Sequence, residues 1–180
     1  MIHGDVYPIH TDFRVGIAYF TTLLHREPMT VQRFLTLWYP SAVPTDTEAA
    51  QEAANRFFRC GAEPNGGAEE ATAPAYAYDA DAEAIIAAFQ REYGIDLTTA
   101  SVHWWRFCAL LRGLLTHGFA ERVRYRVCDV ESIKDTELRR ECRKYKARYA
   151  LDATGRPIRQ PETLDAYNEM LLRIARGETR

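Results

Sequence analysis

The chain has 180 residues and a mass of 20.6 kDa, a size that fits one domain with a short extension. Apolar residues make up 47% of the sequence, which is enough for a sizeable core and argues against wholesale disorder. The 23 basic and 25 acidic residues give a net charge of −2, which argues against a strongly basic nucleic-acid-binding protein. We expect no membrane-spanning helix and no secretory signal, because no apolar run is long enough and the N-terminus lacks an apolar core.

The first forty residues predict two helices. Thr11 is the expected cap of the first helix, and Pro28 and Pro40 are the expected start and end of the second. In both, apolar residues recur every three or four positions, as a single buried helix face requires. They are Phe13, Ile17, Phe20 and Leu24 in the first helix and Val31, Phe34, Leu35 and Trp38 in the second. Gly16 should weaken the first helix by about 1 kcal/mol relative to alanine.

A third helix and a loop follow. Thr45 and Glu48 have the spacing of a capping box, and Gly61 is the expected stop. Residues 61–75 contain no large apolar side chain, so burial cannot offset the entropy lost in ordering them. We interpret this segment as a mobile loop within one domain.

The middle of the chain has the strongest apolar pattern. A fourth helix is expected from a cap at Asp79 to Gly94, and a fifth over residues 101–117, ended by Gly118. The fifth is apolar around most of its circumference, which is typical of a helix buried on most sides. We therefore expect a central, Trp-rich helix, and the structural core is predicted to include Trp104, Trp105, Phe107, Phe89 and Leu111.

A basic helix is expected near residue 140. Residues 119–130 fit a short helix better than a strand, and residues 133–149 are helical again, with Asp135 and Arg139 as a favourable pair. One face of the later helix is apolar through Leu138, Cys142, Tyr145 and Tyr149; the other carries Arg139, Arg140, Arg143, Lys144, Lys146 and Arg148. Residues 41–100 have a net charge of −8 and residues 101–150 one of +6. This asymmetry predicts pairing within the chain or head-to-tail association of copies.

The basic face is the candidate interaction site. We take Arg139, Arg140, Arg143 and Lys144 as candidate protein-binding residues, facing an acidic protein surface. The same face would also suit a nucleic-acid backbone, or would simply be solvated, and the sequence leaves these alternatives open. Further candidates for surface exposure are Tyr7, Tyr19, Tyr39, Tyr76, Tyr78, Tyr125 and Tyr167, although most aromatic residues should belong to the core.

The fold class that follows is mainly α, a compact domain of about seven or eight helices. Residues 1–151 form this single domain. Residues 152–180 are expected to form a C-terminal helical extension, with a helix that starts at Pro161. Its apolar stripe is Leu164, Tyr167, Leu171 and Ile174.

Motifs that would indicate catalysis or metal binding are missing from the sequence. There is no phosphate-binding glycine loop, nucleophile elbow or His-Glu-x-x-His pattern. His103 is interpreted as an imidazole at the edge of the core, not a buried base, and Asp79 and Asp81 as first-turn acids of a helix. The four cysteines, Cys60, Cys108, Cys128 and Cys142, lack metal-ligand spacing and are expected to be reduced. We expect no enzyme, no cofactor and no metal.

Several short segments resemble one known family. The most specific is His103-Trp-Trp-Arg-Phe107 with its prelude Tyr93-Gly-Ile-Asp-Leu97; weaker matches are the segments 7–14, 57–61 and 78–82. Over about residues 7–151 the chain resembles the bacteriophage gene-product-fifteen family, small proteins encoded in the tail module of long-tailed phages and prophages. The Ala- and Gly-rich residues 61–75 and the tail after 151 depart from the pattern.

The resemblance implies a role in phage tail morphogenesis in the host cytoplasm. Genes of the family lie between those of the major tail protein and the tape-measure protein, a place that tail assembly chaperones occupy in other phages. It therefore implies a chaperone whose partners are the tape-measure protein and tail tube subunits, with a possible homo-oligomer. The alternatives are a structural virion component, such as a tail-completion or connector subunit, and then a nucleic-acid-binding accessory protein.

Overall fold

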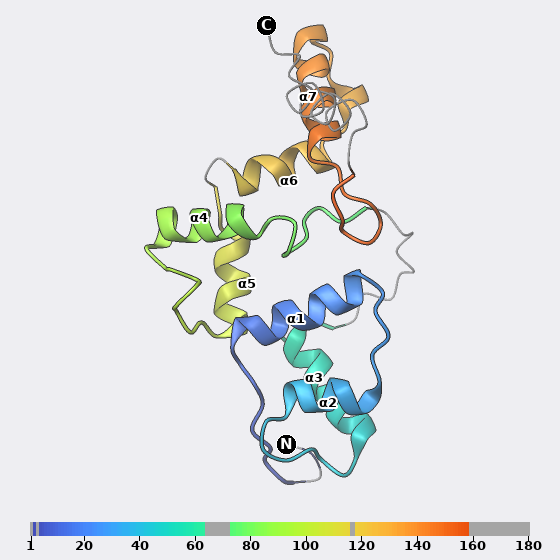
Figure 1. Ribbon diagram of the computed structural model, residues 1–180, viewed down its shortest axis with the longest axis vertical. Helices are drawn as coiled ribbons and strands as arrows, with labels where there is room; N and C mark the ends of the chain where they lie inside the picture. The colour runs from blue at the N-terminus through green and yellow to red at the C-terminus, as the bar shows by residue number, and fades with distance from the viewer. Residues whose placement is uncertain (1, 3, 64–72, 116–117, 159–180) are drawn as a thin grey trace, which may run out of the picture.

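The computed structural model describes residues 2, 4–63, 73–115 and 118–158. Within these ranges the chain is helical, with three isolated backbone bridges but no β-strand (Figure 1). The elements are α1 Phe13–Leu24, α2 Val31–Trp38, α3 Thr47–Phe58, α4 Ala82–Tyr93, α5 Trp104–Arg112, α6 Phe119–Val127, the 3-10 turn η1 Val130–Ser132 and α7 Thr136–Arg148. The prediction of a mainly α-helical protein is confirmed, and no helix in the described ranges has the length and apolar character needed to cross a membrane.

The helices form three groups along an elongated molecule (Figure 1), and each group has its own apolar cluster. α2, α3 and the N-terminal segment lie at one end, around Trp38, and α1, α4 and α5 form the middle, around Phe89 and Phe107. α6, η1 and α7 pack on one another at the other end, around Tyr125 and Cys142. We call residues 119–149 the arm, and residues 4–63 together with 73–115 the body.

The first and third helices begin one residue later than predicted, and the second begins three residues later. The predicted caps are Thr11 and Thr45 and the predicted first residue of the second helix is Pro28, whereas α2 begins at Val31 and the capping side chains are those of Asp12, Thr30 and Asp46. Asp12 caps α1 because its Oδ1 accepts the Arg14 amide at 3.0 Å, and the Thr11 carbonyl accepts the backbone N–H of Trp104 at 2.6 Å. This bond joins the start of α1 to the start of α5, a contact between segments that helix-start rules cannot anticipate.

Helix α5 is shorter than the predicted 101–117 at both ends. His103 is exposed and caps it, because Nδ1 accepts the Trp105 amide at 3.2 Å, so His103 is neither a buried base nor part of the core. The helix ends at Gly113, whereas Gly118 precedes α6 with φ 110°. The end is supported by α4, whose Tyr93 hydroxyl donates to the Leu110 carbonyl at 2.9 Å.

Gly16 allows α1 and α5 to approach closely. A Cβ at this position would overlap the indole ring of Trp104. The Trp104 ring in turn stacks on Phe58, with centroids 5.3 Å apart, and its Nε1–H donates to the Phe58 carbonyl at 2.7 Å. The residue that weakens α1 as an isolated helix is therefore the one that lets it pack against the core.

The link between arm and body is a buried ion pair. Asp81, rather than Asp79, lies at the start of α4, and its fully buried carboxylate does not cap the helix. Its two oxygens lie 2.6 and 3.0 Å from Nη1 and Nη2 of Arg126 on α6, and Arg122 Nη1 lies 3.4 Å away. Arg126 Nε also donates to the carbonyl of Tyr149, which follows α7, at 2.6 Å. Two side chains thus connect α4, α6 and the end of α7.

Several residues lie elsewhere than predicted. Trp105 is 43% exposed, because it follows Trp104 by one position on a helix and points away from the core that Trp104 enters. Four tyrosines predicted to be exposed are buried: Tyr19, Tyr39, Tyr78 and Tyr125. The hydroxyls of Tyr19 and Tyr39 donate to Asn55 Oδ1 and the Ala50 carbonyl, both at 2.8 Å, which satisfies them inside the core. Burial raises the pKa of both tyrosines.

The chain leaves α7 through a tight turn that returns to the body. Gly155 has φ 78° and packs against Leu24 of α1, and the Ile158 amide donates to the Ala150 carbonyl at 2.9 Å. Residues 152–158 are therefore not helical. Some predictions fall outside the described residues. These are the helix predicted to start at Pro161, which contains Tyr167, and also His117 and most of the predicted loop 61–75.

Replacing Gly16 tests the packing of α1 on α5. Helix propensity alone predicts that Gly16→Ala stabilises the protein by about 1 kcal/mol. The contact with Trp104 predicts the opposite sign, a loss of about 1–3 kcal/mol, because the new methyl group overpacks the interface. Urea unfolding followed by circular dichroism gives the sign; a stabilised variant would contradict the packing described here.

Replacing Asp81 tests the link between arm and body. Asp81→Asn leaves Arg126 buried without its counter-ion, so we expect a loss of about 3–5 kcal/mol in the free energy of unfolding. The control is Asp79→Asn two residues earlier, where the carboxylate is half exposed and the loss should be small. Equal effects of the two substitutions would show that the buried pair adds no stability.

Candidate protein-binding site

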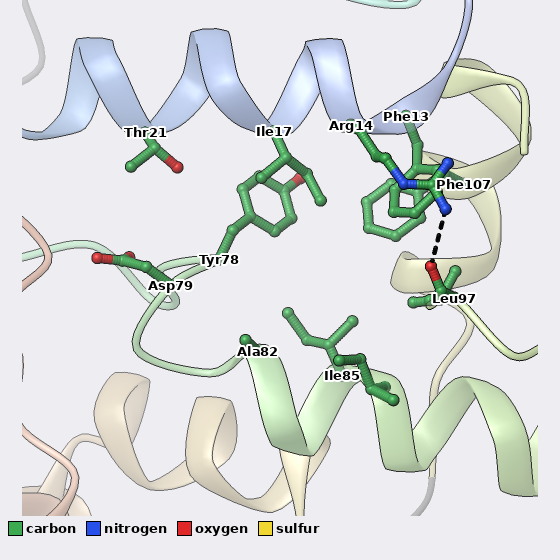
Figure 2. Close-up of a pocket in the computed structure, with 11 residues that line it drawn as sticks. Phe13, Arg14, Ile17, Thr21, Tyr78, Asp79, Ala82, Ile85, Leu97 and Phe107 are labelled. Carbon is green, nitrogen blue, oxygen red and sulfur yellow. Dashed lines mark hydrogen bonds between the residues drawn. The ribbon is translucent and has the colours of Figure 1, made fainter. Parts of the chain in front are cut away.

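A mainly apolar groove lies between α1 and α4 (Figure 2). Its volume is about 340 Å³, and it is open to solvent along one side. Apolar side chains form its floor and walls, and polar groups stand at its two ends. The lining residues are Phe13, Arg14, Ile17, Thr21, Tyr78, Asp79, Ala82, Ile85, Ile86, Leu97 and Phe107.

Aromatic packing fixes the inner wall of the groove. Phe107 of α5 stacks on Phe13 of α1 and on Phe89 of α4, with ring centroids 4.9 and 5.2 Å apart. Tyr78 fills the space between α1 and the start of α4, and its burial raises its pKa, so it stays neutral. A wall made of interlocked rings is rigid, and the groove is therefore formed before any ligand binds.

Arg14 stands at one end of the groove and is held in place. Its Nη2 donates to the carbonyls of Leu97 and Ala100 at 3.2 and 3.0 Å, and its Nη1 lies 3.2 Å from the Asp12 carboxylate. Desolvation acts to raise the pKa of Asp12. Hydrogen bonds from the Arg14 amide and the Ser101 hydroxyl, together with the charge of the Arg14 guanidinium, outweigh desolvation, so the pKa of Asp12 is lowered. The end of the groove at Arg14 is therefore positively charged, with the guanidinium half exposed.

Asp79 stands at the other end. Its Oδ2 lies 3.1 Å from Nε2 of His25, the residue that follows α1. This distance is that of an ion pair if the imidazole is protonated, but the two groups are not aligned for a hydrogen bond. The carboxylate is half exposed, and it points outward from the end of the groove, away from Tyr78 and Ile85 (Figure 2). The groove is thus apolar along its length, basic at one end and acidic at the other.

The groups around the groove suit binding better than reaction chemistry. Arg14 and Asp79 lie at opposite ends, and the residues between them are apolar, apart from the hydroxyls of Thr21 and Tyr78. The four cysteines are free thiols, and burial, followed by the neighbouring Cys60, raises the pKa of Cys108 to about 12, which leaves it protonated at neutral pH. In the described ranges, no three His, Cys, Asp or Glu side chains gather as metal ligands.

The basic residues predicted to bind protein lie on α7, far from this groove (Figure 1). Arg140 pairs with Glu137 at 2.8 Å and Arg143 with Glu131 at 3.0 Å. Arg139 is half-buried, and its Nε donates to the Ile133 carbonyl, while Asp135, its predicted partner, caps α7. Lys144 is exposed. Part of the predicted positive face is therefore neutralised by carboxylates of the arm itself.

The predicted core residues divide into two groups. Trp104, Phe107, Phe89 and Leu111 are buried in the central cluster, whereas Trp105 lies outside it. The groove itself was not predicted, although Ile17, Ile85 and Ile86 belong to apolar helix faces seen in the sequence. Which apolar residues remain partly uncovered depends on the packing of α1 against α4, and periodicity carries no signal for that.

The comparison with known protein families agrees with the resemblance of the sequence. The family model described as "Bacteriophage Gp15 protein" matches residues 1–151, so the chain belongs to this phage protein family. No curated protein and no solved structure matches the chain. The family places the protein among phage structural or morphogenesis proteins.

The acid sensitivity of Asp12 tests the charged end of the groove. Because its pKa is lowered below 3.8, its carboxylate stabilises the fold fully above that pH, and the contribution is lost as the pH falls through the lower folded-state value. Asp12→Asn keeps an oxygen for capping but removes the charge. We expect the variant to be less stable than the wild type at pH 7 and the difference to shrink as the pH is lowered below 3.8, measured by urea unfolding. A difference that stays constant with pH would show that the charge is not the cause.

Proposed function

We propose that this protein is a tail assembly chaperone, a non-enzymatic protein that binds an amphipathic helical segment of the phage tape-measure protein. The observation that carries the proposal is the preformed apolar groove between α1 and α4 with charges of opposite sign at its ends. Membership of a phage family of structural or morphogenesis proteins sets the biological context. The tape measure as client follows from the resemblance and remains part of the proposal.

The dimensions of the groove suit a short stretch of helix. Its α1 wall runs from Phe13 to Thr21, eight residues of rise or about 12 Å, which is about two turns of a bound helix. A helix that presents apolar residues at positions i, i+3 or i+4, and i+7 would place them along the apolar floor. The two ends then select its direction, because the negative C-terminal end of a helix dipole is attracted to Arg14 and the positive N-terminal end to Asp79.

A chaperone of this kind needs modest affinity. A tape-measure protein is long and helical with apolar faces, so it tends to aggregate before the tail tube encloses it. A groove two helical turns long covers only a small part of such a client, far below the area of a stable interface. Many copies would therefore be needed along one client, and tube subunits could displace each of them.

The groove is tested by a charge placed in its wall. Ile86 lines the groove on α4 and is 36% exposed, so Ile86→Asp should leave the fold intact and weaken client binding about tenfold or more, because a carboxylate would be desolvated by the bound helix. The matched control is Val31→Asp, another exposed β-branched residue at 47%, which lies on α2 outside the groove.

Binding is measured by fluorescence anisotropy with labelled helical fragments of the tape-measure protein of the same phage or prophage. The proposal predicts binding by the wild type and the Val31 variant and weakened binding by the Ile86 variant. Absence of binding by the wild type to every fragment, or equal affinity of the two variants, would contradict it. Mass spectrometry of purified phage particles gives a second test, since a chaperone should be absent from the virion and a connector subunit present.

A further inference from the structure

We propose that copies of this chain associate head to tail, with the outer face of α7 of one copy seated in a groove beside Trp105 on the body of the next. This inference concerns contacts between copies and does not depend on the client groove or on the proposed function. It rests on two surfaces at different ends of the molecule that are complementary in chemistry and charge.

The first surface is the outer face of α7. Leu138 is 50% exposed there and lies in a shallow depression of about 590 Å³, which is lined also by Glu137, Arg140, Glu141, Lys144 and Tyr145. The side of the helix toward α6 is covered through Cys142 and Tyr145. A large aliphatic side chain ringed by charges of both signs is the usual composition of a small protein contact, with an apolar centre and a polar rim.

The second surface is a groove of about 580 Å³ between α3 and the start of α5. Trp105 forms one side of it, stacked on Phe57 with ring centroids 5.5 Å apart, and its Nε1–H donates to the Phe57 carbonyl at 2.8 Å. The indole is thus held rigid while 43% exposed, which is the state of an interface anchor before binding. Glu52 and Arg56 of α3 line the groove, one turn apart.

The charges of the two surfaces are complementary. With α7 antiparallel to α3 of the neighbour, Leu138 would cover the Trp105 ring while Lys144 meets Glu52 and Glu141 meets Arg56. The net charges of the arm and the body also favour this contact. The arm holds ten basic and six acidic residues, a net of +4, and the body holds eight basic and twelve acidic residues, a net of −4. Long-range attraction therefore favours arm against body over arm against arm.

The placement of the surfaces makes the contact one between different molecules. α7 lies at one end of the long axis, and α3 with the N-terminal segment lies toward the other (Figure 1). The two surfaces differ, so the interface is heterologous and each copy keeps one free arm and one free groove. Such a contact builds a ring if its rotation closes and an open stack if it does not.

The test uses one variant defective in each surface. Leu138→Asp with Lys144→Glu alters the arm, and Glu52→Lys with Ala53→Arg alters the groove; all four residues are exposed. The control for charge reversal is Lys134→Glu, also exposed in the arm but outside the depression on α7. Sedimentation velocity of the full chain, up to about 0.5 mM because small interfaces bind weakly, gives the association state.

We expect the wild type and the Lys134 variant to associate with rising concentration, and each double variant alone to associate at least about tenfold more weakly. An equimolar mixture of the two double variants should associate again, because the intact arm of one variant meets the intact groove of the other, and because Lys144→Glu and Glu52→Lys restore opposite charges where the two altered surfaces meet. Association of the mixture would also show that both variants are folded. A wild type that stays monomeric, variants that associate like the wild type, or a mixture that stays monomeric would each overturn the proposal.

Fluorescence quenching reports on the same contact from inside the groove. The three tryptophans of the chain differ in exposure, since Trp38 and Trp104 are buried and Trp105 is not. Acrylamide quenching of the wild type should therefore fall as the protein concentration rises, because α7 of the neighbour covers Trp105. Association without any change in quenching would place the interface elsewhere and overturn the assignment of the groove.

Discussion

The arrangement of the whole molecule depends on one buried carboxylate. Asp81 receives two hydrogen bonds from Arg126, which also reaches the Tyr149 carbonyl, so the start of α4, the last turn of α6 and the end of α7 meet at one point. A buried pair of this kind adds little net stability over an apolar contact, but it tolerates only one geometry because any other leaves a charge unpaired. The arm is therefore fixed at the end of the body, and its basic face is carried away from the groove between α1 and α4.

A second constraint forms that groove. Gly16 lets α1 approach Trp104, and the stacked rings of Phe13, Phe107 and Phe89 then set how far α1 stays from α4. The apolar side chains of Ile17 and Ile86 are left between the helices with no partner within the described chain that fills the space. The same close packing that stabilises the core thus produces the candidate binding site.

The candidate site was the least predictable part from sequence. The basic residues of α7 were chosen because their charge is visible in the chain, yet Arg140 and Arg143 face carboxylates of Glu137 and Glu131 in the folded arm. Arg14 and Asp79, which mark the ends of the groove, lie 65 positions apart and carry no local pattern. Trp105 was assigned to the core because the fifth helix is apolar around most of its circumference, whereas its angular position on α5, next to Trp104, decides its exposure.

The sequence by itself determined the mainly helical class, the existence of each described helix and the family, because amphipathic spacing and short motifs are local properties of a chain. The tertiary structure alone decided where α5 starts and ends, why Gly16 is tolerated in α1 and what Asp81 does. In each case the partner group comes from a distant segment: the Thr11 carbonyl, the Trp104 ring and the Arg126 guanidinium. Contacts between segments so far apart exist only once the helices have packed, and no local periodicity encodes them.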